Sequence, residues 1–237
     1  MHKVEIPQVY IDRIIHRAGR AHLVEALDGP TTALVVIDMQ NFFMDDAYAA
    51  ACPVARDIVP NINALADATR HAGGLVVWVR MVAPPGSDQS WSAFHERFTA
   101  AHGKARLDDL AAGAAGYALW DGMDVGDGDE VVDKNRYSAF IKGASEIEPL
   151  LRGRGIETLV FTGVATNVCV ESSARDAMML NFRTLMVSDG CATKTDAEHN
   201  ATLAIFHTRF GDVRETAEVI EMLEQSATGK AAAAAAE

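Results

Sequence analysis

The chain has 237 residues, of which 49% are hydrophobic and 7% aromatic, a composition typical of a globular domain rather than a disordered segment. Its 21 basic and 33 acidic residues give a formal net charge of −12, which would repel a phosphate backbone and argues against nucleic-acid binding. A membrane span needs about 18 consecutive apolar residues, and no run in the sequence approaches that length. Residues 1–20 also lack the apolar region of a signal peptide. A cytoplasmic protein with no membrane partner is expected.

The first half of the chain predicts an N-terminal extension, two strands and a long irregular segment. Residues 7–27 alternate apolar and charged positions at helical spacing, which predicts one or two helices in an extension formed by residues 1–30. "TTALVVIDMQ" predicts a first buried strand and "LVVWVRMV" a second, with a helix over about residues 58–72 between them. Residues 84–129 are rich in glycine and aromatic residues and predict a functional loop region with short helices.

The second half predicts regular alternation of strands and helices. Strands are expected from "DEVVDK", "TLVFTGVAT" and "RTLMVSD", with a short one around Val213. The helices that follow them are expected over residues 145–154, 167–180 and 196–210 and up to Glu224. Such alternation implies parallel pairing with helices on both faces of the sheet. The predicted fold class is α/β: one three-layer α/β/α domain over residues 31–226, Rossmann-like, with a mostly parallel six-stranded sheet. The remaining residues, 227–237, are a low-complexity tail.

Three residues able to do chemistry fall where such a sheet binds ligands, beyond the carboxyl ends of its strands. They are Asp38, Lys134 and Cys169. Cys169 opens a predicted helix after "GVATN", where the positive end of the helix dipole favours a thiolate and small residues let backbone amides approach a substrate oxygen. A lone cysteine is more often a buried structural residue, and Cys52 and Cys191 are assigned to that class.

Asp38 and Lys134 also have ordinary explanations. An aspartate at a strand end is commonly a turn or helix-capping residue, and a single lysine is usually solvated. Beside a thiol, however, Asp38 could take the thiol proton. Lys134 could then pair with the carboxylate and add positive charge near the thiolate. The three residues together favour nucleophilic catalysis more strongly than any one of them.

Three segments of the chain also resemble a known family. "ALVVIDMQNFF", "VVDKNRYSAF" and "LVFTGVATNVCVESSARDAMMLNF" are similar, in order and spacing, to the signature segments of the isochorismatase-like cysteine hydrolase superfamily. The last two are most similar to its ureidoacrylate amidohydrolase branch. The resemblance covers residues 31–213, and it leaves the N-terminal extension and residues 84–120 without a matching pattern.

The resemblance implies a fold and a set of site residues. It implies a parallel sheet flanked by helices, with a catalytic triad at Asp38, Lys134 and Cys169. It also implies a cis peptide bond between Val164 and Ala165, and an oxyanion hole formed by the backbone amides of Ala165 and Cys169.

No metal and no cofactor is expected. Zinc-dependent nicotinamidases of the same superfamily carry Asp-x-His after the first strand, whereas this chain has "NFFMDDAYAAAC" there. His95 and His102 lie far along the irregular segment. The alternative is a degenerate metal site that uses Asp45 or Asp46. A dinucleotide site is rejected because no G-x-G-x-x-G follows the first strand.

The resemblance implies a cysteine hydrolase that cleaves a C–N bond of a small amide, ureido or N-carbamoyl substrate through a thioester. The alternatives are an isochorismatase-type vinyl-ether hydrolase and a non-catalytic binding member of the same fold. A homo-oligomer is expected from the apolar helix faces. Residues beside the three strand ends could line the substrate pocket or belong to the core or rim, and Asn167, like Glu171, could instead cap its helix. The pocket candidates are Gln40, Asn41, Phe43, Trp78, Arg80, Tyr137, Ser138 and Asn167.

Overall fold

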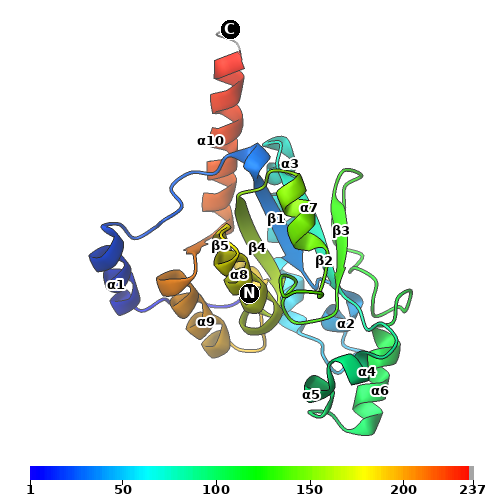
Figure 1. Cartoon of the computed structure of the whole chain (residues 1–237). Helices are drawn as coiled ribbons and strands as arrows, with labels where there is room; N and C mark the ends of the chain where they lie inside the picture. The colour runs from blue at the N-terminus through cyan, green and yellow to red at the C-terminus, as the bar shows by residue number, and fades with distance from the viewer. Residues whose placement is uncertain (235–237) are drawn as a thin grey trace.

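A parallel sheet forms the centre of the molecule. The computed structural model describes the backbone of residues 1–234 and the side chains of residues 1–229 (Figure 1). Within that part of the chain the sheet has six strands in the order β3-β2-β1-β4-β5-β6, and every neighbouring pair is parallel. The predicted α/β class and six-stranded sheet are therefore confirmed. The strands are β1 (Thr32–Ile37), β2 (Leu75–Met81), β3 (Glu130–Lys134), β4 (Thr158–Val164), β5 (Arg183–Ala192) and β6 (Asp212–Arg214).

Helices cover both faces of this sheet. Every residue of β1 and β4 is buried, as a near-continuous apolar run in a parallel sheet requires. Side chains alternate between the faces along each strand, so Ile37 and Val36 belong to different core clusters. Helices α7 (Ile147–Gly153), α8 (Glu171–Met179) and α9 (Asp196–Arg209) pack on the face of Ile37, whereas α3 (Val59–His71) and α10 (Thr216–Ala234) pack on the face of Val36.

The segment between β2 and β3 folds as a group of short helices. These are α4 (Ser87–Ser90), α5 (Ser92–His95) and α6 (Ala100–Asp109). Figure 1 shows them together at the lower right, at the opposite end of the molecule from the protruding end of α10. The side chain of Thr99 accepts a hydrogen bond from the amide of His102 and so caps the first turn of α6.

The N-terminal extension contains one helix, α1 (Gln8–Ala18), which lies beside α9 at the left of Figure 1. It ends at Gly19, whose φ of 76° allows its amide to donate to the Ile15 carbonyl. The chain then continues without a second helix to the short 3₁₀ helix η1 (Gly29–Thr31). The apolar spacing of residues 7–27 therefore extends further than the helix, because Gly19 terminates it.

Two other boundaries differ from the sequence-based expectation. Strand β5 runs to Ala192, three residues past the predicted run. The helix predicted over residues 167–180 begins as a π-helical turn, η3 (Thr166–Val170), and continues as α8.

Among the described helices, none is long and apolar enough to cross a membrane. Residues 235–237, the end of the expected low-complexity tail, lie outside the described residues.

Candidate active site

Asp38 directly follows β1 and has an unusual backbone conformation. Its φ is 54°, a left-handed value that is uncommon for a residue other than glycine. Its amide donates to the Val79 carbonyl at 2.8 Å, and its own carbonyl accepts from the amide of Gln40 at 2.8 Å. In regular extended backbone the side chain would share the face of Val36. The positive φ interrupts that alternation, and the carboxylate pairs with Lys134 and neighbours Cys169 on the other face.

Lys134 ends β3 and points inward. Its Nζ atom donates to Oδ2 of Asp38 at 2.8 Å and to the carbonyl of Arg136 at 3.1 Å. Both Lys134 and Asp38 have 0% of their side chains exposed. Strand β2 lies between β1 and β3, so the lysine reaches across the end of a neighbouring strand to make this ion pair. Because a buried charge is costly unless it is paired, each residue compensates for the burial of the other.

Cys169 lies in the π-helical turn η3, which follows β4 directly. Such turns are rare and often occur at functional sites. The peptide bond between Val164 and Ala165, at the start of this turn, is cis, at the position that the family resemblance implies. The carbonyl of Ala165 accepts from the amides of Val168 and Val170 at 3.0 and 3.2 Å, which closes the turn beneath the thiol.

The Cys169 thiol is protonated at neutral pH in this environment. Burial raises its pKa, the Lys134 ammonium opposes that rise, and the Asp38 carboxylate adds to it by charge and by hydrogen bonding, which brings the pKa to about 12. The dipole at the helix start was expected to favour a thiolate, but burial outweighs the dipole. The thiolate is therefore not preformed here. The adjacent carboxylate is that of Asp38, and its Oδ1 atom has no hydrogen-bond partner of good geometry among the described residues.

A cavity of about 260 Å³ opens above Cys169. Ala165 and Val168 contribute to its floor, and most of its wall is apolar or aromatic. Two of the pocket residues expected from the sequence, Phe43 and Tyr137, line it. The remaining lining residues are Ala50, Cys52, Phe94, Phe98, Arg106, Val164 and Lys194. The thiol of Cys52, which the sequence assigned to the core, therefore also borders this cavity.

Other expected pocket residues brace the site from outside the cavity. Gln40 is fully buried, and its amide donates to the carbonyls of Met81 and Tyr117 while its oxygen accepts from the Met81 amide. Asn41 donates to the carbonyl of Ala115 at 2.9 Å. These contacts use the amide groups to hold the end of β2 and the segment after α6, and neither residue lines the cavity.

Ser138 and Asn167 also lie outside the cavity lining. The Ser138 hydroxyl accepts from the amide of Phe140 at 3.1 Å, within the turn that follows Lys134. The Asn167 side chain accepts from the Thr193 hydroxyl at 2.7 Å and so links η3 to the end of β5. Both residues fix the backbone of segments that carry site residues.

Trp78 and Arg80 lie on the wrong face of the sheet for this cavity. Residues 77, 79 and 81 of β2 belong to the core cluster that contains Cys169, so 78 and 80 point the other way. Trp78 is fully buried and donates to Asp129, whereas Arg80 pairs with Asp133 at 2.9 Å. Because side chains alternate between the two faces of the sheet along a strand, the sequence alone could have excluded both residues from the pocket.

The residues expected as alternative metal ligands have other partners. Asp46 pairs with Arg56 at 3.1 Å, and Asp45 accepts from the amide of Ala47 at 2.9 Å. Within the described part of the chain, the one group of three side chains close enough to share a metal ion is formed by His22, His207 and Asp212. These belong to the N-terminal extension, α9 and β6 and are not part of the cavity beside Cys169.

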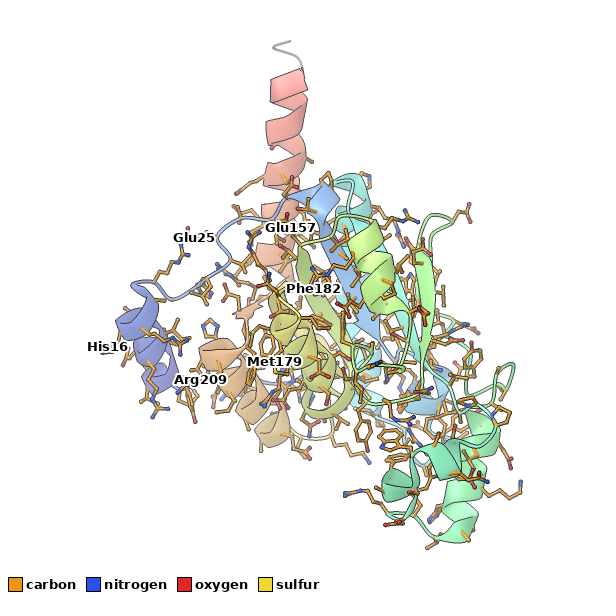
Figure 2. All side chains as sticks on the ribbon, viewed as in Figure 1. His16, Glu25, Glu157, Met179, Phe182 and Arg209 are labelled. Atoms are coloured by element: carbon orange, nitrogen blue, oxygen red, sulfur yellow. The ribbon has the colours of Figure 1, made fainter. Side chains whose placement is uncertain are left out.

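A second cavity, of about 350 Å³, lies where the extension meets the domain. Phe182 and Arg209, labelled in Figure 2, line it together with Arg17 and His207. The side chain of Arg17 donates to the carbonyl of Thr208, and the amide of Val24 donates to Asp212. No residue predicted from the sequence as part of the site lines this cavity, and these contacts attach the extension to α9 and β6.

Comparison with known proteins gives the same family as the signature segments. The family model described as "Isochorismatase domain" matches residues 32–218. The uncharacterized isochorismatase family protein YwoC of Bacillus subtilis is 32% identical over 204 residues, which cover 84% of this chain and 97% of YwoC. Ureidoacrylate amidohydrolase RutB of Caulobacter vibrioides is 33% identical over 217 residues, covering 86% of this chain and 96% of RutB.

A solved structure agrees with these relatives. The crystal structure of a cysteine hydrolase from Pseudomonas syringae pv. phaseolicola superposes with a TM-score of 0.73 and 26% identity, covering 85% of this chain and 96% of that one. The chain therefore belongs to the isochorismatase family and is an isochorismatase-family hydrolase.

Proposed function

We propose that the chain is a cysteine hydrolase that cleaves a C–N bond of a small amide, ureido or N-carbamoyl compound. The proposal is carried by the fully buried ion pair of Lys134 and Asp38, placed beside a thiol at the base of a cavity. Similarity to an amidohydrolase, RutB, supports the choice of a C–N bond. The apolar wall of the cavity supports a small organic substrate.

The first half of the reaction acylates Cys169. The thiol keeps its proton until a substrate binds, since burial holds its pKa near 12. Asp38 takes that proton as the sulfur attacks the carbonyl carbon, and it returns the proton to the leaving nitrogen when the C–N bond breaks. The products of this half are a thioester on Cys169 and ammonia or an amine.

The second half releases the acyl group. Asp38 removes a proton from water, the resulting hydroxide attacks the thioester carbonyl, and the proton returns to the Cys169 sulfur. Lys134 donates to Oδ2 of Asp38, so its role is to orient that carboxylate and to supply positive charge near the sulfur. It is a positioning residue in this scheme.

Backbone amides stabilise the oxyanion in both halves. Ala165 and Cys169 both border the cavity, and the amide of Ala165 has no hydrogen-bond acceptor among the described residues. An unused donor beside the nucleophile is positioned to bind the oxygen on which negative charge develops. The family resemblance, which implies the same two amides, supports this assignment.

An ammonia-release screen tests the proposal. Wild-type protein is incubated with small primary amides, N-carbamoyl compounds and ureido acids, and each positive reaction is repeated after treatment with a thiol-alkylating reagent. Release from at least one class, abolished by alkylation of Cys169, is the expected result. Hydrolysis of a vinyl ether such as isochorismate, with no ammonia from any class, would contradict it.

A further inference from the structure

The guanidinium of Arg106, on α6, has no carboxylate partner in the part of the chain that the structure describes. Its guanidinium lies 5.0 Å from the ring centroids of Phe42 and Phe94 and 6.0 Å from that of Phe98. Among the described residues, its side chain makes no hydrogen bond and no ion pair within 4.0 Å. Arginine is suited to such an aromatic setting because its guanidinium is weakly hydrated and stacks on rings.

This guanidinium lies at the junction of two cavities. It lines the cavity of about 260 Å³ above Cys169 and an outer cavity of about 340 Å³. Its charge acts on the Cys169 thiol and on the hydroxyl of Tyr137. Lys194, which is exposed, borders both cavities as well. Two cations therefore face the space that a substrate must enter to reach the sulfur.

The remaining charges around this space do not neutralise Arg106. Asp38 is paired with Lys134, and Asp109 borders only the outer cavity, where it makes no ion pair with Arg106. Burial disfavours the charged form of Arg106 and lowers its pKa, with only partial compensation by surrounding groups. A partly desolvated cation of this kind gains most from a ligand that supplies two acceptor oxygens in one plane.

We propose that Arg106 binds a carboxylate of the substrate, so that the enzyme selects small amide or ureido compounds with a carboxylate over neutral ones. The inference rests on the proposed function for the amide or ureido group of the substrate. It rests on the charges around the cavity for the carboxylate of the substrate. Arg106 and Lys194 attract the carboxylate, and Phe94, Phe98 and Phe43 exclude water around the chain that joins it to the scissile carbonyl.

The kinetic test compares matched substrates. N-carbamoylglycine, 3-ureidopropionate and 4-ureidobutyrate are each assayed against a neutral alkylurea in which an isopropyl group replaces the carboxylate. We expect at least one acid to be preferred in kcat/KM by about 10- to 100-fold, the range of a charge-assisted hydrogen-bonded pair. Arg106→Met keeps an apolar stem among the rings and should remove most of this preference by raising KM for the acid. Arg106→Lys should restore part of it.

Lys104→Met is the matched control. Lys104 lies on the same helix and is exposed, and it pairs with Asp108, so the substitution removes one positive charge outside the cavity. It should leave the preference within about twofold of wild type, since exposed charges contribute little. If the wild type has the same kcat/KM for an acid and for its neutral urea, the inference is overturned. It is also overturned if Arg106→Met lowers kcat equally for both substrates, because the charge of Arg106 would then act on the thiol instead of on the substrate.

A binding measurement separates this inference from the proposed function. Calorimetric titration of Cys169→Ala with the same acids and alkylureas needs no turnover. Tighter binding of an acid, lost in Cys169→Ala/Arg106→Met and kept in Cys169→Ala/Lys104→Met, supports the receptor even if the proposed chemistry fails. If no acid binds more tightly than its neutral counterpart, the receptor is wrong. Wild-type turnover by Cys169→Ala would instead refute the proposed mechanism and leave this measurement unaffected.

Discussion

The ammonium of Lys134 lies 2.8 Å from Oδ2 of Asp38, and neither side chain is exposed. The pair joins the ends of two strands that are separated by β2, and it leaves Oδ1 of Asp38 free of other good hydrogen bonds in the described structure. One oxygen of the carboxylate is thus held by the lysine, and the other remains for the thiol of Cys169. This division is the geometric basis of the proposed roles of the three residues.

Replacing Lys134 should remove activity even when the charge is kept. Lys134→Arg and Lys134→Met should each lower kcat by about 10²-fold or more, because the planar fork of arginine does not fit the position of an ammonium and methionine has no charge. Asp38→Asn/Lys134→Met should be little worse in kcat than either single variant, since the two residues act as one unit. Steady-state kinetics on a substrate from the ammonia-release screen measures this.

Stability distinguishes that loss from simple unfolding. Lys134→Met leaves the buried carboxylate of Asp38 unpaired, at a cost of about 3–5 kcal/mol in the free energy of unfolding, whereas the double variant should recover part of it while staying inactive. Lys142→Met, on an exposed lysine of the same region, is the control for both measurements. If Lys134→Met keeps more than about half of wild-type kcat/KM, Lys134 has no role in the chemistry.

Alkylation of Cys169 should increase with pH without levelling off below about pH 10, because its pKa is about 12. The sign of each neighbour follows from its charge. Asp38→Asn removes a group that raises the thiol pKa and should speed alkylation at a given pH, whereas Lys134→Met should slow it. Peptide mapping after iodoacetamide treatment separates Cys169 from Cys52 and Cys191. A plateau at or below pH 8 would mean that the thiolate is preformed.

Gly163 should tolerate no side chain. Its φ is 109°, and an added Cβ would lie 2.1 Å from the carbonyl oxygen of Ile37, the residue before Asp38. Gly163→Ala should lower the free energy of unfolding by about 2–5 kcal/mol and reduce activity, since the clash moves the backbone on which Asp38 is placed. Gly153→Ala is the control, because a Cβ there meets open space at the end of α7. Thermal unfolding of the two variants gives the comparison, and equal stability would refute the claim.

Asp212 should make the attachment of the N-terminal extension sensitive to acid. Burial raises its pKa, but the neighbouring His207 and His22 side chains and the amide of Val24 together outweigh burial, so the pKa lies below its usual value. A carboxyl group whose folded pKa is lowered stabilises the fold above its unfolded pKa of about 3.9, and this contribution is lost as the pH falls through the folded pKa.

Asp212→Asn should therefore lower the free energy of unfolding by about 1–3 kcal/mol at pH 6, and by progressively less below about pH 4. The exposed Asp121→Asn is the control. Tm measured against pH for the three proteins tests this, and a difference between wild type and Asp212→Asn that does not shrink in acid would contradict it.

The sequence predicted the sheet and the meeting of three strand ends because both follow from strong local signals. Apolar runs fix the strands, and parallel pairing brings their carboxyl ends to one edge. Asp38 directly follows β1, Lys134 is the last residue of β3, and Cys169 lies in the turn after β4. Alternation along β2 also contained the information that Trp78 faces away from the cavity, since its neighbours Val77 and Val79 form the core on the side of Cys169.

Arg106 could not have been located in this way. It lies on α6, in the long segment between β2 and β3 and far along the chain from either strand end, so its distance from Cys169 depends on how that segment packs over the sheet. The same holds for Phe94 and Phe98, whose aromatic character was visible in the sequence but whose direction was not. Gln40 was placed correctly at the strand end, but its buried amide binds backbone groups that only the fold brings near.

Turnover by Cys169→Ala tests the central claim most directly. The variant is compared with wild type on any substrate found in the ammonia-release screen, with Cys52→Ala as the control for a second thiol at the same cavity. The account predicts that Cys169→Ala loses at least about 10³-fold in kcat while its Tm stays near that of the wild type, and that Cys52→Ala stays active. A Cys169→Ala protein that retains kcat within about tenfold of the wild type would show that the sulfur is not the nucleophile.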